Sequence, residues 1–342
     1  MVILPSPASP PPNLGPDSGR SSGPSADSRT QHLSLLALFA GATAIGFAPL
    51  FVRLSELGPS ATGFHRLFLA MPVLWIWHGV DAARHGSPHS SHPSASSVPR
   101  GAWLGFVAAG LFFAGDLAFW HWSIRLTSVA NATLLTNLAP VFVTLAAFAL
   151  YGERFSPRFL AGMALALVGA AVLMGQSVTV SMSHLLGDGL GLVTAMFYGA
   201  YIVAVGRLRI RYDTATIMAR SGLVTCVALL IVALASGESL IATSLAGWAT
   251  LLALALFSHV GGQSLIAYAL AHLPVAFSSV GLLLQAVVAA FLAWVLLGEA
   301  LGPWQALGAA IVLAGIVLAR QGSRQSAIQP PVPVPPSPGR PI

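Results

Sequence analysis

Charged side chains are scarce in this sequence: they make up 8% of its 342 residues, against about 25% in a soluble globular domain. A water-soluble enzyme of this size is therefore excluded, because the chain cannot cover its surface with charge. Lysine is absent, and all 16 basic residues are arginines, which excludes a P-loop ATPase and a Schiff-base enzyme. The single cysteine, Cys226, excludes a disulfide framework and a cysteine-ligated metal site.

Hydrophobic residues make up 56% of the chain, and the mean hydropathy is +0.79. A membrane-spanning helix needs about 20 apolar residues, and charge-free runs of that length recur along the sequence. The sequence therefore predicts an all-α polytopic membrane protein with the lipid bilayer as its first partner. Breaks at Gly, Pro, Ser and Arg clusters divide it into ten predicted spans: 33–52, 61–80, 101–124, 127–151, 158–176, 187–206, 214–235, 246–270, 275–297 and 303–319.

The arginines are distributed unevenly between the two sides that these spans define. An even number of spans puts both termini on one side, where 12 arginines fall, whereas only Arg53 and Arg125 fall on the other. The positive-inside rule then predicts cytoplasmic termini in a bacterial inner membrane. The same arginines explain the pI near 10.4, so a nucleic-acid partner is not predicted. The Pro- and Ser-rich tails, 1–32 and 321–342, are predicted to be disordered.

The sequence contains an internal repeat, which divides it into five-span halves at 33–176 and 187–320. Each half ends with the same motif at an offset of 146 residues. Because five is an odd number, the second half must insert upside down relative to the first, which is typical of secondary transporters. The glycine before each acid suits a tight helix exit, and the later glycines suit close helix packing. The matched pairs are Gly152 and Gly298, Glu153 and Glu299, Gly162 and Gly308, and Gly169 and Gly315.

The segments around these motifs resemble the EamA domain. In the first half they are Phe64 to Ala70, and Leu138-Ala139-Pro140-Val141 followed by Gly152-Glu153-Arg154; in the second, Leu284-Gln285-Ala286-Val287 with Gly298-Glu299. Two such domains in tandem are the pattern of the drug/metabolite transporter superfamily. The resemblance implies two inverted five-helix repeats around a central cavity, and export or exchange of small metabolites. Ala286 stands where the family often has proline, which removes the usual cause of a kink there.

Asp116 is the only acid well inside a predicted span, and Trp120 lies one helical turn after it. A carboxylate at the membrane centre costs about 2.5–3.5 kcal/mol on insertion scales, so it normally faces a cavity or a partner. One interpretation is a protonatable or cation-binding group beside an aromatic wall. The other is a packing role, in which Asp116 pairs with Arg125 or with a neighbouring helix.

Arg66 and Arg220 occupy equivalent places in the two repeats, following Ala61-Thr62 and Ala215-Thr216. Each enters its helix by about six residues, or about 9 Å, which is within reach of the membrane interface. Interface anchoring and contact with a substrate carboxylate are both open interpretations.

Further polar side chains recur at helical spacing and predict the lining of one polar cavity with aromatic walls. His259, like Asp116, is a candidate for proton coupling, because an imidazole titrates near neutral pH. Each of these groups taken alone also fits a role in holding helices together. Besides Arg66, Asp116, Trp120 and Arg220, the predicted cavity residues are Thr133, Asn137, Tyr198, Tyr201, His259, Gln263 and Gln285.

These features predict a secondary transporter that moves a small metabolite, such as an amino acid or a drug-like compound, with a proton as the coupling ion. The one match to a catalytic motif, Gly-Arg-Ser-Ser-Gly at 19–23, lies in the tail that is predicted to be disordered, so neither an enzyme activity nor a cofactor is predicted. A non-transporting sensor and an intramembrane enzyme are the alternative functions. The sequence leaves the substrate, the direction of transport and the oligomeric state open, with a homodimer as one alternative.

Overall fold

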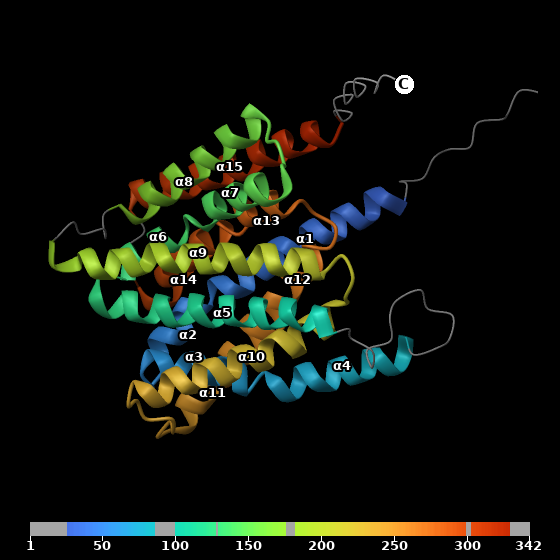
Figure 1. Ribbon diagram of the computed structural model, residues 1–342. Coiled ribbons are helices and arrows are strands. Elements are labelled where there is room, and N and C mark those ends of the chain that lie inside the picture. The colour runs from blue at the N-terminus through green and yellow to red at the C-terminus, as the bar shows by residue number, and fades with distance from the viewer. Residues whose placement is uncertain (1–25, 86–99, 128, 176–181, 299–301, 329–342) are drawn as a thin grey trace, which may run out of the picture.

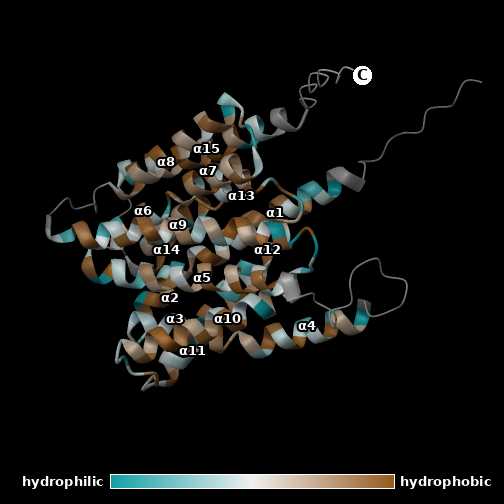
Figure 2. Ribbon diagram, in the orientation of Figure 1, coloured by the Kyte–Doolittle hydropathy of each residue, from teal (hydrophilic) through white to brown (hydrophobic). Residues whose placement is uncertain are grey.

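The computed structural model describes residues 26–85, 100–127, 129–175, 182–298 and 302–328, and the regular structure in these ranges is entirely helical. The long helices lie side by side along one common direction (Figure 1). Apolar residues cover most of their length, and hydrophilic ones gather toward their ends (Figure 2). The predicted all-α membrane fold is confirmed.

Five of the predicted spans are continuous helices. A one-turn 3-10 helix, η1 (Met182–His184), leads into the third of them. The five are α5 (Arg100–Leu126), α8 (Pro157–Met174), α9 (Leu185–Leu208), α10 (Thr214–Ala235) and α15 (Pro303–Ile328).

The other five spans are interrupted. Four consist of two helices each: α1 (Ala26–Gly46) with α2 (Ala48–Leu54), α3 (Pro59–Phe68) with α4 (Met71–His85), α6 (Val129–Thr136) with α7 (Ala139–Tyr151), and α13 (Val275–Gly281) with α14 (Leu284–Leu297). The fifth runs through α11 (Leu245–Ala253), the π-helix η2 (Leu254–Gln263) and α12 (Ser264–Ala269).

The helices match the ten predicted spans. Within the described residues, 9 stretches are long and apolar enough to cross a membrane, and α3 with α4 makes up the remaining span. Two differences lie at the ends of the chain. Residues 26–32 and 321–328, predicted to belong to disordered tails, are helical. Extending an existing helix fixes one residue for each added hydrogen bond, so the terminal spans continue into polar sequence.

Proline accounts for three of the interruptions. Pro49, Pro72 and Pro140 each stand at the second residue of the helix that follows a break. Proline has no backbone N–H to donate and its ring clashes with the preceding turn, so the helix cannot run through it. The second repeat breaks at Leu282–Leu283, close to the position equivalent to the break at 137–138, although Ala286 replaces the proline. The kink therefore forms without its usual cause.

The helix exits at the repeat motif are left-handed turns. Gly152 and Gly298 have φ angles of 65° and 68°, a conformation that costs a glycine little. After the first turn, the N–H of Glu153 donates to the carbonyl of Ala147 at 3.2 Å, which completes the helix cap. Glu153 itself is exposed, and Glu299 lies outside the described residues.

Helices α8 and α15 pack backbone against backbone through the repeated glycines. A Cβ atom on Gly162 would lie 2.3 Å from the nitrogen of Ala319, and one on Gly308 would lie 2.4 Å from the nitrogen of Leu173. These two contacts are equivalent, because Gly308 and Ala319 each follow their counterparts, Gly162 and Leu173, by 146 residues. The predicted role of these glycines in close packing is confirmed.

The same contacts establish how the repeats are related. Gly162, near the start of α8, faces Ala319, well along α15, whereas Gly169 faces the earlier Val312. Equivalent helices of the two repeats therefore run antiparallel, as two inverted repeats require. In Figure 1, α8 and α15 lie together along the upper edge of the molecule.

We expect Gly169→Ala to destabilise the protein by about 1–3 kcal/mol, the usual cost of overpacking. The new Cβ would lie 2.5 Å from the backbone nitrogen of Val312, which cannot move aside as a flexible side chain can. Thermal unfolding of the detergent-solubilised protein measures the effect. The matched control is Gly79→Ala, because nothing lies within 4 Å of a Cβ atom there. Equal unfolding temperatures for the two variants would contradict the packing argument.

Candidate functional site

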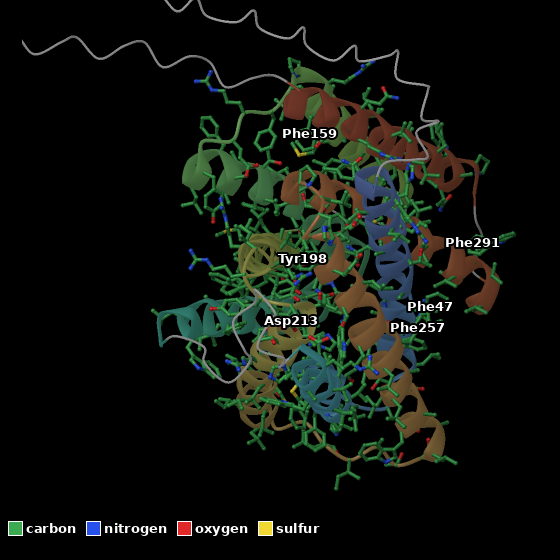
Figure 3. All side chains as sticks on the ribbon, turned by 90° about the vertical axis from the view of Figure 1, so that its right-hand side faces the viewer. Phe47, Phe159, Tyr198, Asp213, Phe257 and Phe291 are labelled. Carbon is green, nitrogen blue, oxygen red and sulfur yellow. The ribbon has the colours of Figure 1, made fainter. Side chains whose placement is uncertain are left out.

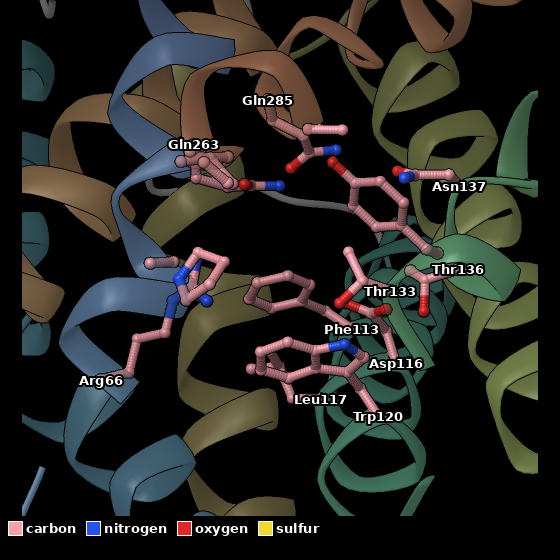
Figure 4. Close-up of a pocket in the computed structure, with 17 residues that line it drawn as sticks. Arg66, Phe113, Asp116, Leu117, Trp120, Thr133, Thr136, Asn137, Gln263 and Gln285 are labelled. Carbon is pink, nitrogen blue, oxygen red and sulfur yellow. The ribbon is translucent and has the colours of Figure 1, made fainter. Parts of the chain in front are cut away.

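A cavity of about 100 Å³ lies between the interrupted helices and is lined from both repeats (Figure 4). Tyr198, which lines it, occupies the middle of the molecule in Figure 3, whereas Phe291 projects from an edge. From the first repeat the lining comprises Ile45, Gly46, Ala48, Pro49, Arg66, Phe113, Asp116, Leu117, Trp120, Thr133, Thr136 and Asn137. From the second it comprises Tyr198, Gln263, Gln285, Ala286 and Ala289.

Two opposite charges line the cavity. Arg66 comes from α3 and Asp116 from α5, and both side chains are buried, with exposed fractions of 6% and 7%. The guanidinium of Arg66 and the carboxyl of Asp116 both line the cavity, and the Nε atom of Arg66 has no hydrogen-bond partner. Arg66 therefore lines the cavity instead of reaching the membrane interface, and it retains a donor for a ligand.

Amides and hydroxyls surround these charges. The hydroxyl of Tyr198 lies close to the Gln285 side chain, and that of Tyr201 close to the Gln263 side chain, so one polar pair joins α9 to α14 and another joins α9 to η2. On the other wall, Asn137 at the break between α6 and α7 has an Nδ2 donor without a partner. These groups leave the cavity with directional hydrogen-bonding capacity beside its charges.

An aromatic stack stands next to the charges. Phe113 lies one turn before Asp116 on α5 and stacks on Tyr201, with ring centroids 4.7 Å apart. It also stacks on His259, at 5.5 Å, and neither ring nitrogen of this buried imidazole has a hydrogen-bond partner. The Arg66 guanidinium lies 5.9 Å from the centroid of the Phe113 ring. The cavity thus combines a charged pair with a rigid aromatic wall.

Eight of the predicted cavity residues line the cavity itself; they are Arg66, Asp116, Trp120, Thr133, Asn137, Tyr198, Gln263 and Gln285. Tyr201 and His259 lie directly behind the lining, through their contacts with Gln263 and Phe113.

Arg220 and Arg125 lie elsewhere. Arg220 is not a lining residue, and its guanidinium lies over the rings of Trp103 and Phe106, at 5.4 and 5.7 Å. Arg125, considered as a partner for Asp116, instead forms an ion pair with Glu238 at 2.5 Å.

Part of the lining was not predicted. Phe113 could have been identified because it lies three residues before Asp116 on one helix face. Gly46, Pro49 and Ala289 have no polar side chain, so the pattern of polar residues along the helices does not indicate them. The Gly-Phe-Ala-Pro sequence at 46–49 does signal a helix break inside the first span.

Comparisons with known proteins match this architecture. A model of the EamA-like transporter family matches residues 32–175 and again residues 185–321. A "Probable terminal-alkyne amino-acid exporter" from Streptantibioticus cattleyicolor is 28% identical over 293 residues, which cover 84% of this chain and 93% of that protein.

Two further similarities agree with this match. An "Uncharacterized transporter" from Archaeoglobus fulgidus is 27% identical over 190 residues, or 54% of this chain, and the match spans 61% of that relative's length. A solved structure, titled only as the crystal structure of a protein, superposes with a TM-score of 0.71 at 20% identity, covering 85% of this chain and 98% of that one. At this identity the likeness concerns the fold alone.

The family match covers both repeats and nearly the whole helical part of the chain, and the inverted arrangement around a shared cavity fits it. The chain belongs to the EamA-like transporter family and is a multi-pass membrane transporter.

Proposed function

We propose that this protein is a secondary active exporter of small metabolites that carry both a carboxylate and an amino group, such as amino acids. The observation that carries this proposal is the pair of opposite charges, Arg66 and Asp116, in one cavity. The guanidinium of Arg66 can bind a substrate carboxylate through paired, charge-assisted hydrogen bonds. The carboxylate of Asp116 can bind a substrate ammonium group in the same way. The similarity to an amino-acid exporter supports the same substrate class.

The size and walls of the cavity fit such a ligand. A volume of about 100 Å³ suits a compact molecule and is well below the roughly 300–1,000 Å³ of sites for drug-sized ligands. Trp120 and Leu117 offer an apolar surface for a side chain, while Gln285 and Asn137 offer hydrogen bonds. Small amino acids and related metabolites are therefore favoured over bulky drug-like compounds.

The transport mechanism that we propose is alternating access. Inverted repeats have two nearly equivalent arrangements, in which the halves rock about a pseudo-two-fold axis and expose the site to each side in turn. The sequence has no lysine and hence no Walker A motif, so we assign the energy source to an ion gradient.

Asp116 is the proposed proton-coupling group. When its carboxyl is ionised it attracts the substrate ammonium, and when it is protonated that attraction is lost, so proton binding and substrate binding compete. His259 is the second candidate, because its unpaired imidazole lies against Phe113 beside the same cavity.

In liposomes without ATP, we expect the purified protein to move a labelled amino acid and to do so faster when a pH gradient is imposed. Asp116→Asn should abolish the pH-driven component and leave only slower exchange at equal pH, because an amide cannot take up the proton and attracts the substrate ammonium less strongly. Glu153→Gln, at an exposed acid, serves as the control. pH-driven transport that persists in Asp116→Asn would assign Asp116 to packing. Absence of flux for a broad panel of metabolites in the parent protein would favour a sensor.

Arg66→Gln should weaken binding of a transported amino acid by about 10- to 100-fold, the loss expected for a hydrogen bond to a charged group. Binding of the corresponding amine, which has no carboxylate, should change little. Ligand-induced thermal shifts measure both affinities. Arg220→Gln is the matched control, since Arg220 is the equivalent residue of the second repeat and lies outside the cavity. Equal losses in the two variants, or an equal loss for the amine, would refute carboxylate recognition by Arg66.

We also propose that both termini face the cytoplasm of a bacterial cell, with the protein in the inner membrane. The excess of arginines on the side of the termini supports this orientation. A reporter enzyme inserted after Gly237 should then be active only outside, and one inserted after Arg211 only inside. The opposite pattern of reporter activity would reverse the orientation.

A further inference from the structure

Glu238 connects the two repeats at the face of the molecule opposite to the start of α1 and the end of α15 (Figure 1). It lies in the loop between α10 and α11, but its carboxylate reaches the first repeat. One oxygen accepts a hydrogen bond from the backbone N–H of Ala61 at 2.9 Å, in the first turn of α3. The other accepts from Arg125, near the end of α5, at 2.5 Å. The Glu238 side chain is only 8% exposed, whereas that of Arg125 is 46% exposed, so the ion pair lies at the surface of the molecule.

Glu56 makes the reciprocal connection. It lies in the loop between α2 and α3 of the first repeat and accepts hydrogen bonds from the start of α11 in the second. The donors are the N–H and hydroxyl of Thr243, both at 2.9 Å, together with the N–H of Ser244, at 3.1 Å, and its hydroxyl. These bonds, led by those of the Ser244 and Thr243 side chains, lower the pKa of Glu56, so its carboxylate stays ionised at neutral pH.

A glycine of the opposite repeat makes room for each carboxylate. A Cβ atom on Gly58 would lie 2.3 Å from the carboxylate of Glu238, and one on Gly247 would lie 2.6 Å from that of Glu56. Each acid therefore sits directly on the backbone at the start of a helix in the other half, where the helix dipole favours negative charge.

The first turn of α10, the counterpart of α3 in the second repeat, is capped within its own repeat. There Asp213 accepts from the N–H of Thr216 at 2.6 Å, three residues along the same chain segment. Helix α3 has Gly58 at its N-cap and no side-chain cap of its own, so its first turn depends on Glu238. The two equivalent helices thus differ in whether their capping acid comes from within the repeat or from across it.

Helix α3 connects this contact to the cavity. Ala61 and Arg66 lie five residues apart in one ten-residue helix, which corresponds to about 7.5 Å along its axis. Between them, Gly63 packs against the imidazole of His121 on α5. A displacement of the first turn of α3 would therefore be transmitted to the guanidinium that lines the cavity.

We propose that Glu238, Arg125 and Glu56 form a latch that holds this face of the transporter closed, and that Glu238 also acts as a positioning residue for Arg66 through α3. Release of the latch frees the two loops from each other, and α3 then moves together with Arg66. Opening of this face and reorganisation of the cavity are thereby coupled in one step.

Access of a thiol reagent to the cavity tests the latch. The native thiol is removed by Cys226→Ala, and Ala289→Cys places a reporter in the cavity lining. A second variant, Ser239→Cys, shows which side of the membrane the latch faces, because Ser239 is exposed there. A membrane-impermeant maleimide is then added to the side on which this variant reacts. In this background, Glu238→Gln and Glu56→Gln should each speed labelling by about tenfold or more, because hydrogen bonds to a carboxylate are weakened or lost.

Arg125→Gln should have a smaller effect of the same sign, because it removes the ion pair and leaves the bond between Glu238 and Ala61 intact. It also carries the test if Glu238→Gln does not fold. Glu153→Gln is the control, an exposed acid outside the latch, and should label at the parent rate. Labelling of all folded latch variants at the parent rate would overturn the proposal. This readout needs no substrate, so a protein that transported nothing in liposomes would still test the latch.

Discussion

The hydrocarbon environment restricts where this chain can leave the α-helix. In lipid each backbone N–H and C=O needs a partner within the protein, so non-helical backbone is tolerated only where protein covers it or where it borders a cavity. Four of the five interrupted spans have their irregular turn at the cavity. Gly46, Asn137, Gln263 and Gln285 lie at or beside these turns and line it. The breaks thus bring the polar side chains of Asn137, Gln263 and Gln285 to the cavity.

Helix packing, and not proline alone, sets where these breaks fall. The first repeat breaks at 137–138, two residues before Pro140, and the second breaks at almost the equivalent place without a proline. The π-helix η2 disturbs the helical hydrogen-bond pattern in a span that contains no proline between Leu245 and Ala269. Such π-helical turns are frequent at functional sites. A proline accompanies the break at 137–138 but not the one at 282–283, so a break at this place does not require proline.

The parts of the structure that follow from local composition were predictable. The spans, their number and the repeat depend on runs of apolar residues and on matched positions such as Gly162 and Gly308, which the sequence displays directly. The cost of charge in lipid predicted a cavity or a partner for Asp116, but it left Arg66 open between the membrane interface and the cavity. The contacts of Glu238 did not, because its partner Ala61 is 177 residues away and nothing near either residue indicates the other. The break near Ala286 could not be predicted either, because no proline marks it.

Two of the contacts between the repeats, the one along α8 and α15 and the one at the latch, differ in their chemistry, and this difference suits the proposed rocking motion. Along α8 and α15, backbone meets backbone across glycines, as at Gly169 and Gly308, and the hydrogen bond from the Ser156 hydroxyl to the Gly322 carbonyl lies at one end of this contact. Sliding that contact would force backbone atoms together, so it suits the pivot of the proposed rocking motion. At the latch, the bonds of Glu56 and Glu238 lie at the end of the helices, where water can replace each one. A reversible gate requires both kinds of contact. The packing of α8 against α15 resists displacement, and the latch has polar bonds that water can replace.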